Sequence, residues 1–269
     1  MGEFTVVIPV KDDMRVGRCL ASFDEARAHP LVVMNDPTQE VRELVERAGC
    51  DSLTLPTAGG PAACEAGMQG AGTASVLFMD SDCVFHPGAL TAFAEAVGTA
   101  DFVRGVTIFR HHTRLQRVVA RSRVRHTNMP QMLFKVPLLV DRRVLPKIGG
   151  YLFDSRLAWT EDFDLTMRVR SSGATTRVLR EGVVIHDALT PLRDLTSAYR
   201  YGQGHRGGVR LGLDGYKTVS WKSALSLPWG AIRRDDPTLA FYDHLFNLSF
   251  TAGYKFASAS EGRRLDDLS

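Results

Sequence analysis

The sequence has little of what a zinc cage, a disulfide framework or a membrane span requires. It holds four cysteines, which are widely spaced and form no Cys-x-x-Cys pair: Cys19, Cys50, Cys64 and Cys83. This spacing argues against a zinc cage and gives no disulfide framework, so we expect a reducing, cytoplasmic compartment. No apolar stretch reaches the roughly 18 residues that a membrane span needs, and the first residues do not resemble a signal peptide.

A strong excess of charge of one sign is also absent. The formal net charge is +3 at pH 7, which is too small to predict a nucleic-acid partner. The chain has 269 residues, of which 44% are hydrophobic and 23% are charged, so it can bury a substantial core. We expect one large domain, or one domain with an appendage.

The first part of the chain alternates between strand-like and helix-like segments. Apolar runs rich in β-branched residues predict the strands, and apolar residues at helical spacing predict the helices. We expect strands at 4–10, 31–36 and 52–55, and helices from about 12, at 41–48 and at 62–71. Gly49 is expected to end the second helix. This alternation is typical of a doubly wound α/β domain.

The rest of the chain is organised around an apolar run that ends in two carboxylates. Residues 75–79 predict a buried strand, and Asp80 and Asp82 follow where that strand should end. Burying carboxylates without partners is costly, so the pattern favours a cation or polar ligand at the carboxyl edge of the sheet. The simplest interpretation is a divalent ion that bridges the protein to substrate phosphates. The alternative is that Asp80 caps the next helix and Asp82 is solvated.

More strands and helices are expected beyond this point. The pattern predicts a helix over 87–97 and strands at 101–109, 175–179 and 183–187. Residues 133–140 predict an edge strand, because the proline within them is excluded from the middle of a ladder.

Two of these later elements carry titratable residues at their ends. Glu161, Asp162 and Asp164 cluster at the start of a predicted helix, where the helix dipole alone would favour acidic side chains. His186 lies where the last strand should end. A single histidine is usually structural, but one at the same sheet edge as the two aspartates could join them on a metal.

Basic and apolar segments stand out in the second half. Four arginines fall on one helical face by their spacing: Arg110, Arg114, Arg117 and Arg121. This face is either solvated or a patch for an acidic acceptor, a phosphate or an anionic membrane surface. Residues 199–210 predict a glycine-containing loop that could lie over phosphates. Residues 241–254 predict an apolar helix that packs on the core, on a second subunit or at a membrane surface.

Several motifs, in the expected order, make residues 4–210 resemble a family 2 glycosyltransferase of the GT-A fold. The first strand reads Val-Val-Ile-Pro-Val at 6–10. Asn35 and Asp36 match the polar pair that contacts the nucleotide base in that family. Residues 59–67 are similar to the family's Gly-x-x-x-Ala-Arg-Asn-x-Gly stretch, with Cys64 and Glu65 in place of the Arg-Asn pair.

Two further motifs carry the chemistry that the family performs. Asp80-Ser81-Asp82 matches the Asp-x-Asp motif that holds Mn²⁺ or Mg²⁺ against the nucleotide-sugar diphosphate. Thr160-Glu161-Asp162 matches the Glu-Asp motif whose aspartate is the base in inverting members. Gln203-Gly204-His205-Arg206 resembles a motif of processive synthases, but Gly207 stands where tryptophan would be. A processive polymerase is therefore not expected.

The resemblance implies a fold and an activity. The fold would be a Rossmann-like α/β domain of the GT-A type, with a mixed, mostly parallel central sheet flanked by helices and a C-terminal helical appendage. Residues 1–188 would bind the nucleotide sugar and catalyse transfer, and residues 189–269 would pack on them at the acceptor side, at a membrane surface or in a homodimer. The reaction would be inverting transfer from a nucleotide-diphosphate sugar, most often a UDP-sugar, to an acceptor hydroxyl.

The resemblance also implies the residues of the site. Asp162 would be the general base, with Glu161 beside it, and the metal, Mn²⁺ or Mg²⁺, would be held by Asp82, Asp80 and His186. The donor would be contacted by Pro9, Val10, Asp36, Gly60, Asp80, Ser81, Asp82, Gln203 and Arg206. The basic and apolar helices suggest a lipid-linked or anionic acceptor, met by a cytoplasmic protein that is peripheral at the inner face of the membrane.

Two other interpretations stay open. The chain could be a degenerate GT-A module that binds a nucleotide sugar or a partner without catalysis. An apolar strand followed by Asp-x-Asp also describes a haloacid-dehalogenase-like phosphatase. That class needs a later lysine and a second acidic pair at strand ends, and the available pair, Asp235-Asp236, has no strand before it.

Overall fold

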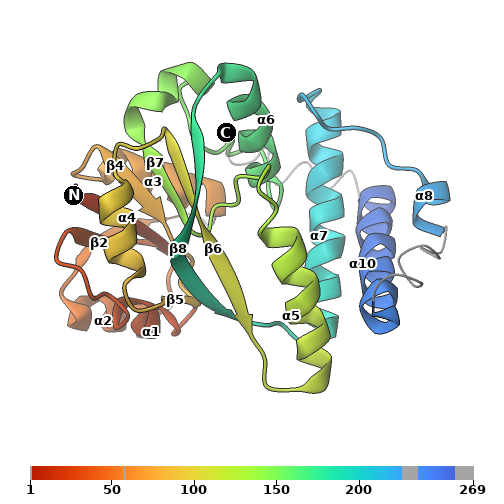
Figure 1. Ribbon diagram of the computed structural model, residues 1–269, viewed down its shortest axis with the longest axis horizontal. Coiled ribbons are helices and arrows are strands. Elements are labelled where there is room, and N and C mark those ends of the chain that lie inside the picture. The colour runs from red at the N-terminus through yellow and green to blue at the C-terminus, as the bar shows by residue number, and fades with distance from the viewer. Residues whose placement is uncertain (1, 57–58, 226–235, 258–269) are drawn as a thin grey trace.

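An eight-stranded sheet forms the centre of the molecule, in the order β3-β2-β1-β4-β7-β6-β8-β5 (Figure 1). The computed structural model describes residues 2–56, 59–225 and 236–257. Four of the strand pairs are parallel and three are antiparallel. The mixed, mostly parallel α/β sheet that the sequence predicts is thereby confirmed.

The first half of the sheet is fully parallel and follows the predicted alternation. Its strands are β1 (Phe4–Val10), β2 (Ala28–Asn35), β3 (Asp51–Leu55) and β4 (Ser75–Phe78). The helices between them are α1 (Val16–Leu20), α2 (Gln39–Ala48) and α3 (Gly60–Gly70). Helix α2 ends at Gly49, whose φ of 65° is left-handed and favours glycine.

Two apolar layers enclose this half of the sheet, because successive residues of a strand point to opposite faces. Val6 and Ile8 of β1 pack into the layer made with α1, α2 and the helix α4 (Ala89–Ala96). Val7, between them, packs into the layer made with α3 and the helix α6 (Glu161–Ser172). Both faces are therefore buried, which explains why the strands read as continuous apolar runs.

The second half of the sheet is mixed and departs from the predictions in three ways. It contains β7 (Leu138–Asp141), β6 (Phe102–Arg110), β8 (Thr176–Asp187) and β5 (Cys83–Phe85). The expected edge strand was wrong: β7 lies between β4 and β6, and the proline causes no conflict because the strand begins one residue after Pro137. The two strands expected at 175–179 and 183–187 are one strand, β8, with an irregularity opposite Arg104 and Val106. Strand β5 was not predicted, since three residues carry almost no periodic signal.

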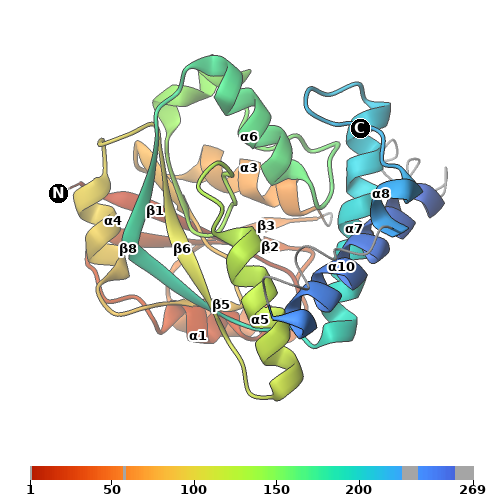
Figure 2. The ribbon, with the colours of Figure 1, turned by 45° about the vertical axis from the view of Figure 1, so that its right-hand side comes forward.

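Three helices form a layer of their own beside the sheet. They are α5 (Arg114–Thr127), α7 (Pro191–Arg210) and α10 (Pro237–Phe256), with the short α8 (Trp221–Leu225) nearby. Helix α5 lies between the sheet and the two long C-terminal helices, and α7 and α10 run side by side (Figure 2). A short 3₁₀ helix, Arg142–Ile148, follows β7.

The C-terminal helices test two predictions. The apolar helix expected at 241–254 is confirmed as part of α10. The loop expected at 199–210 was wrong, because these residues are the last three turns of α7. None of the helices in residues 2–56, 59–225 and 236–257 is long and apolar enough to cross a bilayer. Strand β8 ends at Asp187 and α7 begins at Pro191, so the expected boundary at 188 falls in a connection between elements.

Several arginines of the basic segment pair with acidic side chains from other elements. Arg110 is the last residue of β6, not part of the helix, and pairs with Asp187 at 2.7 Å. On α5, Arg121 pairs with Asp236, and Arg125 lies 3.8 Å from the Asp243 carboxylate of α10.

Arg123 forms the most buried of these pairs. Its Nε lies 2.7 Å from Oδ1 of Asp194 on α7, and the two side chains are only 14% and 2% exposed. The hydroxyl of Tyr242 on α10 donates to the same carboxylate at 2.5 Å. The three helices are thus tied together by one buried, hydrogen-bonded ion pair, the kind whose disruption is costly because it strands a charge.

Helices α7 and α10 approach closely through glycines. A Cβ at Gly253 would overlap the carbonyl oxygen of Tyr199, and a Cβ at Gly202 would overlap that of Phe250. By contrast, a Cβ at Gly207, also on α7, would have no neighbour within 4 Å. The contact between the helices therefore depends on the absence of a side chain at specific positions.

We predict that Gly253→Ala destabilises the protein by about 1–3 kcal/mol, because the methyl group must push two backbones apart. The matched control, Gly207→Ala, should be neutral or stabilising by up to about 1 kcal/mol, since alanine is the better helix former. Urea denaturation followed by circular dichroism measures both. Equal effects at the two positions would contradict the close packing of α7 on α10.

Glu65 of α3 holds the segment that leads into α6. Its Oε1 accepts hydrogen bonds from the backbone N–H groups of Leu152 at 2.8 Å and Phe153 at 2.7 Å. Burial raises the pKa of Glu65 above its usual value, although the two N–H donors act against this. The residue that replaces asparagine in the family pattern therefore has a structural role.

We predict that Glu65→Ala lowers the free energy of unfolding by about 2 kcal/mol or more, because two buried amides lose their acceptor. Glu65→Gln should cost about 1 kcal/mol or less, since its amide oxygen can still accept and burial already disfavours the charge. Urea denaturation separates the two variants. An alanine variant as stable as the glutamine variant would show that the loop does not depend on this acceptor.

Candidate active site

The two carboxylates of the Asp-x-Asp motif lie at the carboxyl edge of the sheet, as predicted. Asp80 follows the end of β4, and the chain turns at Ser81 and Asp82 into β5. Strand β5 pairs antiparallel with β8, with Cys83 opposite His186. This register brings Asp82 and His186 together although they are more than a hundred residues apart in the sequence.

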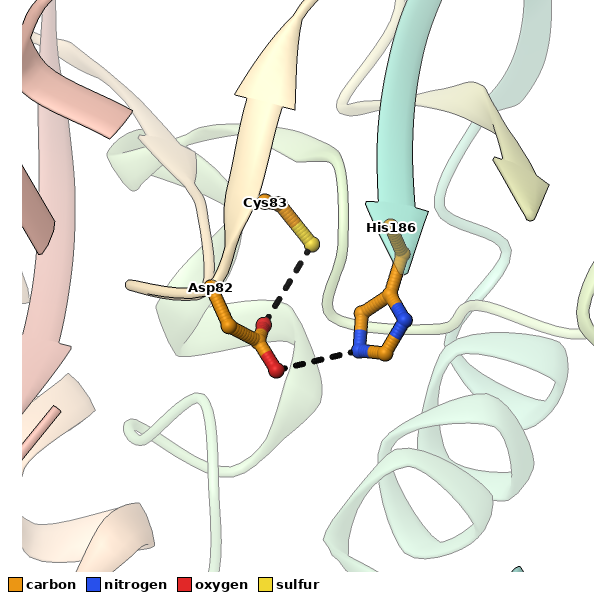
Figure 3. Close-up of side chains that lie close together, drawn as sticks. All are labelled: Asp82, Cys83 and His186. Carbon is orange, nitrogen blue, oxygen red and sulfur yellow. Dashed lines mark hydrogen bonds and ion pairs between the residues drawn. The ribbon is translucent and has the colours of Figure 1, made fainter. Parts of the chain in front are cut away.

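The Asp82 carboxylate is surrounded by donors (Figure 3). Its Oδ2 lies 3.1 Å from Nε2 of His186 and 3.3 Å from Nη2 of Arg15. Its Oδ1 accepts from Sγ of Cys83 at 3.6 Å. Burial alone would raise the pKa of Asp82, but the hydrogen bond and charge of His186, with Arg15, lower it to about 2.

The same interaction also shifts the pKa of His186. Its burial would lower the imidazole pKa, but the hydrogen bond to Asp82 and the nearby carboxylates raise it above the usual value. Its second nitrogen, Nδ1, is buried and has no hydrogen-bond partner in the part of the chain that the structure describes. The side chains of Asp82, Cys83 and His186 point toward one another, and one ligand atom from each lies within 4.8 Å of the others.

These residues fit a divalent cation. Carboxylate and imidazole are ligands that Mn²⁺ and related ions accept, and a cysteine sulfur is a softer ligand. Burial raises the pKa of the Cys83 thiol well above its usual value, so Asp82 and His186 are the better ligands, and His186 must release the proton that its hydrogen bond to Asp82 favours. Asp80, the third expected metal ligand, is not part of this cluster.

Asp80 instead pairs with a lysine that also orients the predicted base. Nζ of Lys135 lies 3.0 Å from Oδ1 of Asp80, and the backbone N–H of Lys135 donates to Oδ1 of Asp162 at 3.0 Å. Burial acts to lower the pKa of Lys135, but Asp80 and the other acidic groups around it raise it well above its usual value. Lys135 thereby links the Asp-x-Asp motif to the Glu-Asp motif.

Asp162 and Glu161 begin α6, as the sequence predicts. Burial and the neighbouring Glu161 carboxylate raise the pKa of Asp162 well above that of an ordinary aspartate. Oε2 of Glu161 and Oγ1 of Thr160 are buried without a hydrogen-bond partner among the described residues. Trp159, just before them, has a φ of 71°, an unfavourable conformation for a bulky residue that is often found at functional sites.

A cavity of about 610 Å³ brings these groups together. Its lining includes Asp80, Lys135, Glu161, Asp162 and His186. The remainder of the lining comes mainly from aromatic and apolar side chains, several of them on α5, α7 and α10. A cavity of this size with a few convergent polar groups is typical of a small-molecule site.

The remaining donor residues expected from the sequence follow β1, β2 and β4. Pro9 and Val10 are the last residues of β1, and Ser81 is buried between the two aspartates. Asp36 follows β2 with a φ of 51°, and its carboxylate lies 3.1 Å from Nζ of Lys11. Gly60 begins α3, and a Cβ there would meet nothing within 4 Å.

The two donor residues expected on the glycine-containing segment lie on α7. Arg206 donates to the carbonyl oxygens of Tyr254 at 3.2 Å and Lys255 at 2.8 Å, at the end of α10. Among the described residues that line the cavity, His205 is present, whereas Gln203 and Arg206 are not. In this structure, Arg206 therefore stabilises the contact between two helices.

Sequence reasoning missed three residues of the site. Lys135 had a signal, because it is a single charge inside the apolar run of residues 133–140. Arg15 and Cys83 had none, since their roles depend on strand β5 and on the fold of the β1–α1 connection. Cys64, in contrast, is fully buried, and burial raises its thiol pKa to about 12, which leaves it an inert core residue.

Comparisons with known proteins show the fold. No protein-family model matches the sequence, and no curated protein matches it. Among solved structures, the mannosyltransferase PcManGT of Pyrobaculum calidifontis, in complex with GDP-Man and Mn²⁺, is similar with a TM-score of 0.65. The two sequences are 13% identical over 94% of this chain and 87% of that chain.

Two other solved structures are similar in the same way. A TarS fragment of S. aureus has a TM-score of 0.55 and 15% identity, over 98% of this chain and 77% of that chain. A mycobacterial protein has a TM-score of 0.58 and 18% identity, over 79% of this chain and 75% of that chain. At these identities the likeness shows the fold alone. It confirms the predicted fold class, a mixed α/β fold shared with this mannosyltransferase.

Proposed function

We propose that this chain is an inverting glycosyltransferase, similar to family 2, that transfers a sugar from a nucleotide-diphosphate sugar to an acceptor hydroxyl. One observation carries the proposal: Asp80, His186 and Asp162 line one cavity, and Asp82 pairs with His186. This reaction needs a basic carboxylate in a cavity and metal ligands beside it. The similarity of the fold to a mannosyltransferase supports the proposal.

The residues of the chain divide the chemistry between them. The acceptor hydroxyl gives its proton to Asp162, whose raised pKa makes its carboxylate a stronger base. Lys135 holds that carboxylate through its backbone N–H and places its ammonium group beside Asp80.

Asp82 and His186 would hold the metal, for which Mn²⁺ and Mg²⁺ are the candidates. When bound, a divalent ion neutralises the negative charge that develops on the leaving diphosphate. The low pKa of Asp82 keeps its carboxylate ionised at neutral pH. Attack from the face of the sugar opposite the diphosphate then inverts the anomeric configuration.

The nucleotide side of the donor would be bound by the residues that follow β1, β2 and β4: Pro9, Val10, Asp36, Gly60 and Ser81. The resemblance to family 2 favours a UDP-sugar, while the mannosyltransferase of similar fold was solved with GDP-Man. The arrangement of Gln203 and Arg206 gives no reason to assign them donor contacts in this conformation. Titration with different nucleotides identifies the nucleotide base of the donor.

Two alternatives have weaker support. A degenerate binding module would not need a carboxylate with a raised pKa beside a metal-ligand pair. For a phosphatase of the haloacid-dehalogenase type, the second acidic pair would be Asp235-Asp236. Asp235 lies outside the described residues, and Asp236 caps α10 and pairs with Arg121, which leaves that carboxylate no role in such a site.

We predict that one of UDP, GDP and TDP binds the purified protein in a metal-dependent way. In calorimetric titrations with and without Mn²⁺, the nucleotide that binds should lose at least about tenfold in affinity without the ion. In Asp82→Ala the gain from Mn²⁺ should disappear, because the ion loses its ionised ligand. Asp51→Ala, at the far end of β3, should behave like the unmodified protein. If no nucleotide binds, the proposal of a glycosyltransferase is wrong.

We predict that Asp162→Asn lowers the rate of sugar transfer by about 10²–10⁴ while nucleotide binding is retained. Asparagine keeps an oxygen that can accept from Lys135, so the loop should hold its position, but the amide cannot take a proton. The control is Asp164→Asn, which removes a charge from the same helix where the carboxylate pairs with Arg168. Hydrolysis of the donor by water provides a readout that needs no acceptor.

The stereochemistry of that hydrolysis tests the inverting mechanism separately. Proton NMR of the first sugar released should show the anomer opposite to that of the donor. Release of the same anomer would contradict direct attack from the far face. In the transfer assay, full turnover of the Asp162→Asn variant would show that Asp162 is not the general base.

A further inference from the structure

The part of the cavity wall formed by α5, α7 and α10 presents several aromatic side chains to a ligand. Its aromatic members are Tyr201, Phe246 and Phe250, and Leu189 lies at the start of the same region. The strands and the loop after α5 add more apolar surface: Phe109, Met132 and Phe134. We call these seven side chains the apolar wall.

Several polar groups interspersed with the apolar wall are paired within the protein. Arg123 and Asp194 pair with each other, and the Arg123 guanidinium also lies 4.0 Å from the ring centroid of Phe246. Nδ1 of His126 is 2.8 Å from the carbonyl oxygen of Ser122, and its ring stacks on Phe246. The hydroxyl of Ser197 donates to the carbonyl oxygen of Arg193. These groups therefore add little hydrogen-bonding demand to this side of the cavity.

Other residues that line the cavity are charged, in contrast to the apolar wall. They include Asp80, Lys135, Glu161 and Asp162. Because a buried charged group needs a polar or charged partner, these side chains indicate where the polar part of a ligand binds. A ligand that fills the cavity must therefore have a polar end as well as an apolar body.

The donor accounts for the polar end only. Its nucleotide would lie over the loops after β1, β2 and β4, on the parallel half of the sheet, whereas α5, α7 and α10 lie beyond the other half. The apolar wall is thus left for the second substrate. This reasoning rests on the proposed function, because it takes the group facing Asp162 to be the acceptor.

We infer that the acceptor is an amphipathic alcohol, with its hydroxyl at Asp162 and an aliphatic or aromatic body against the apolar wall. In the reaction, the alcohol oxygen bonds to the anomeric carbon, the bond from that carbon to the diphosphate breaks, and the hydroxyl proton passes to Asp162. Such an alcohol can reach the cavity from solution or from a lipid layer, and the chemistry of recognition is the same.

The test uses a homologous series of 1-alkanols, from 1-butanol to 1-octanol, with the nucleotide sugar of the base that binds best in titration. We expect kcat/KM for transfer to rise about fourfold for each added methylene, as burial of a CH₂ group gives about 0.8 kcal/mol. Glycerol and D-glucose, as polar alcohols, should be poorer acceptors than 1-octanol. Rates that are independent of chain length, or a preference for the polar alcohols, would overturn the inference.

Two variants on α7 provide a matched comparison. Ser197→Trp places a large side chain into the cavity, whereas Leu192→Trp places one on the outer surface, where Leu192 is 77% exposed. Ser197→Trp should abolish the dependence on chain length while hydrolysis of the donor continues, and Leu192→Trp should retain it. Leu189→Asp, outside the helix, places a charge in the apolar wall and serves as a second test if Ser197→Trp does not fold.

The outcomes separate the inference from the proposed function. If no nucleotide sugar is bound or hydrolysed, the proposed function itself is wrong. If the donor is hydrolysed but no alkanol binds in saturation-transfer NMR or accepts sugar, the inference alone is wrong. Transfer to 1-octanol in solution, compared with transfer to 1-hexadecanol in phosphatidylcholine vesicles, then identifies the source from which the alcohol is taken.

Discussion

The ion pair between Lys135 and Asp80 is the interaction on which the candidate site depends. Asp80, Glu161 and Asp162 line one cavity, and carboxylates gathered in a low-dielectric site repel one another and lose hydration. Lys135 compensates them from two directions, with its ammonium group toward Asp80 and its backbone N–H toward Asp162. The Lys135 side chain is 18% exposed and that of Asp80 is 40% exposed, so solvent screens this pair in part.

The order of the strands explains how this arrangement is built. Strand β7 runs antiparallel to both β4 and β6, so β6 and its parallel neighbour β8 run in the same direction as β4. The ends of β4 and β8 therefore meet at the same edge of the sheet. The segment from Leu133 to Val136, which carries Lys135, leads into β7 at that edge. One interior antiparallel strand thus brings Lys135 and the candidate metal ligands, Asp82 and His186, to the same edge of the sheet.

Much of the fold could be predicted from the sequence because burial produces a local pattern of apolar residues. Strands buried on both faces are apolar throughout, and Asp80, Asp82 and His186 were recognisable because they interrupt such runs near their ends. The same reasoning identified Glu161 and Asp162 at the start of a helix. What the local pattern could not supply was the pairing partner, so Arg15 and the Cys83–His186 register were found only in the structure.

The helical layer shows the opposite case, in which tertiary contacts override local propensity. The Gly-rich end of α7 is unfavourable as a helix in isolation, and the sequence therefore predicts a loop. In the structure, Gly202 lets α7 lie against the backbone of α10, and Gly208 leaves room for Tyr216. The glycines that argue against a helix are what allow this helix to pack. A single sequence does not distinguish glycine used for flexibility from glycine used for close approach.

The ion pairs of the helical layer change how the arginines of α5 are interpreted. From sequence, the arginines of α5 favour an anionic acceptor or membrane surface, because their acidic partners are distant in the chain. In the structure the partners of Arg121, Arg123 and Arg125 come from α7 and from the start and first half of α10, and Tyr242 donates to the carboxylate that Arg123 pairs with. A guanidinium that is already paired gains little from a second anion, since its desolvation has been compensated once. For the acceptor inferred above, selection on this side of the cavity then rests on shape and apolar area more than on charge.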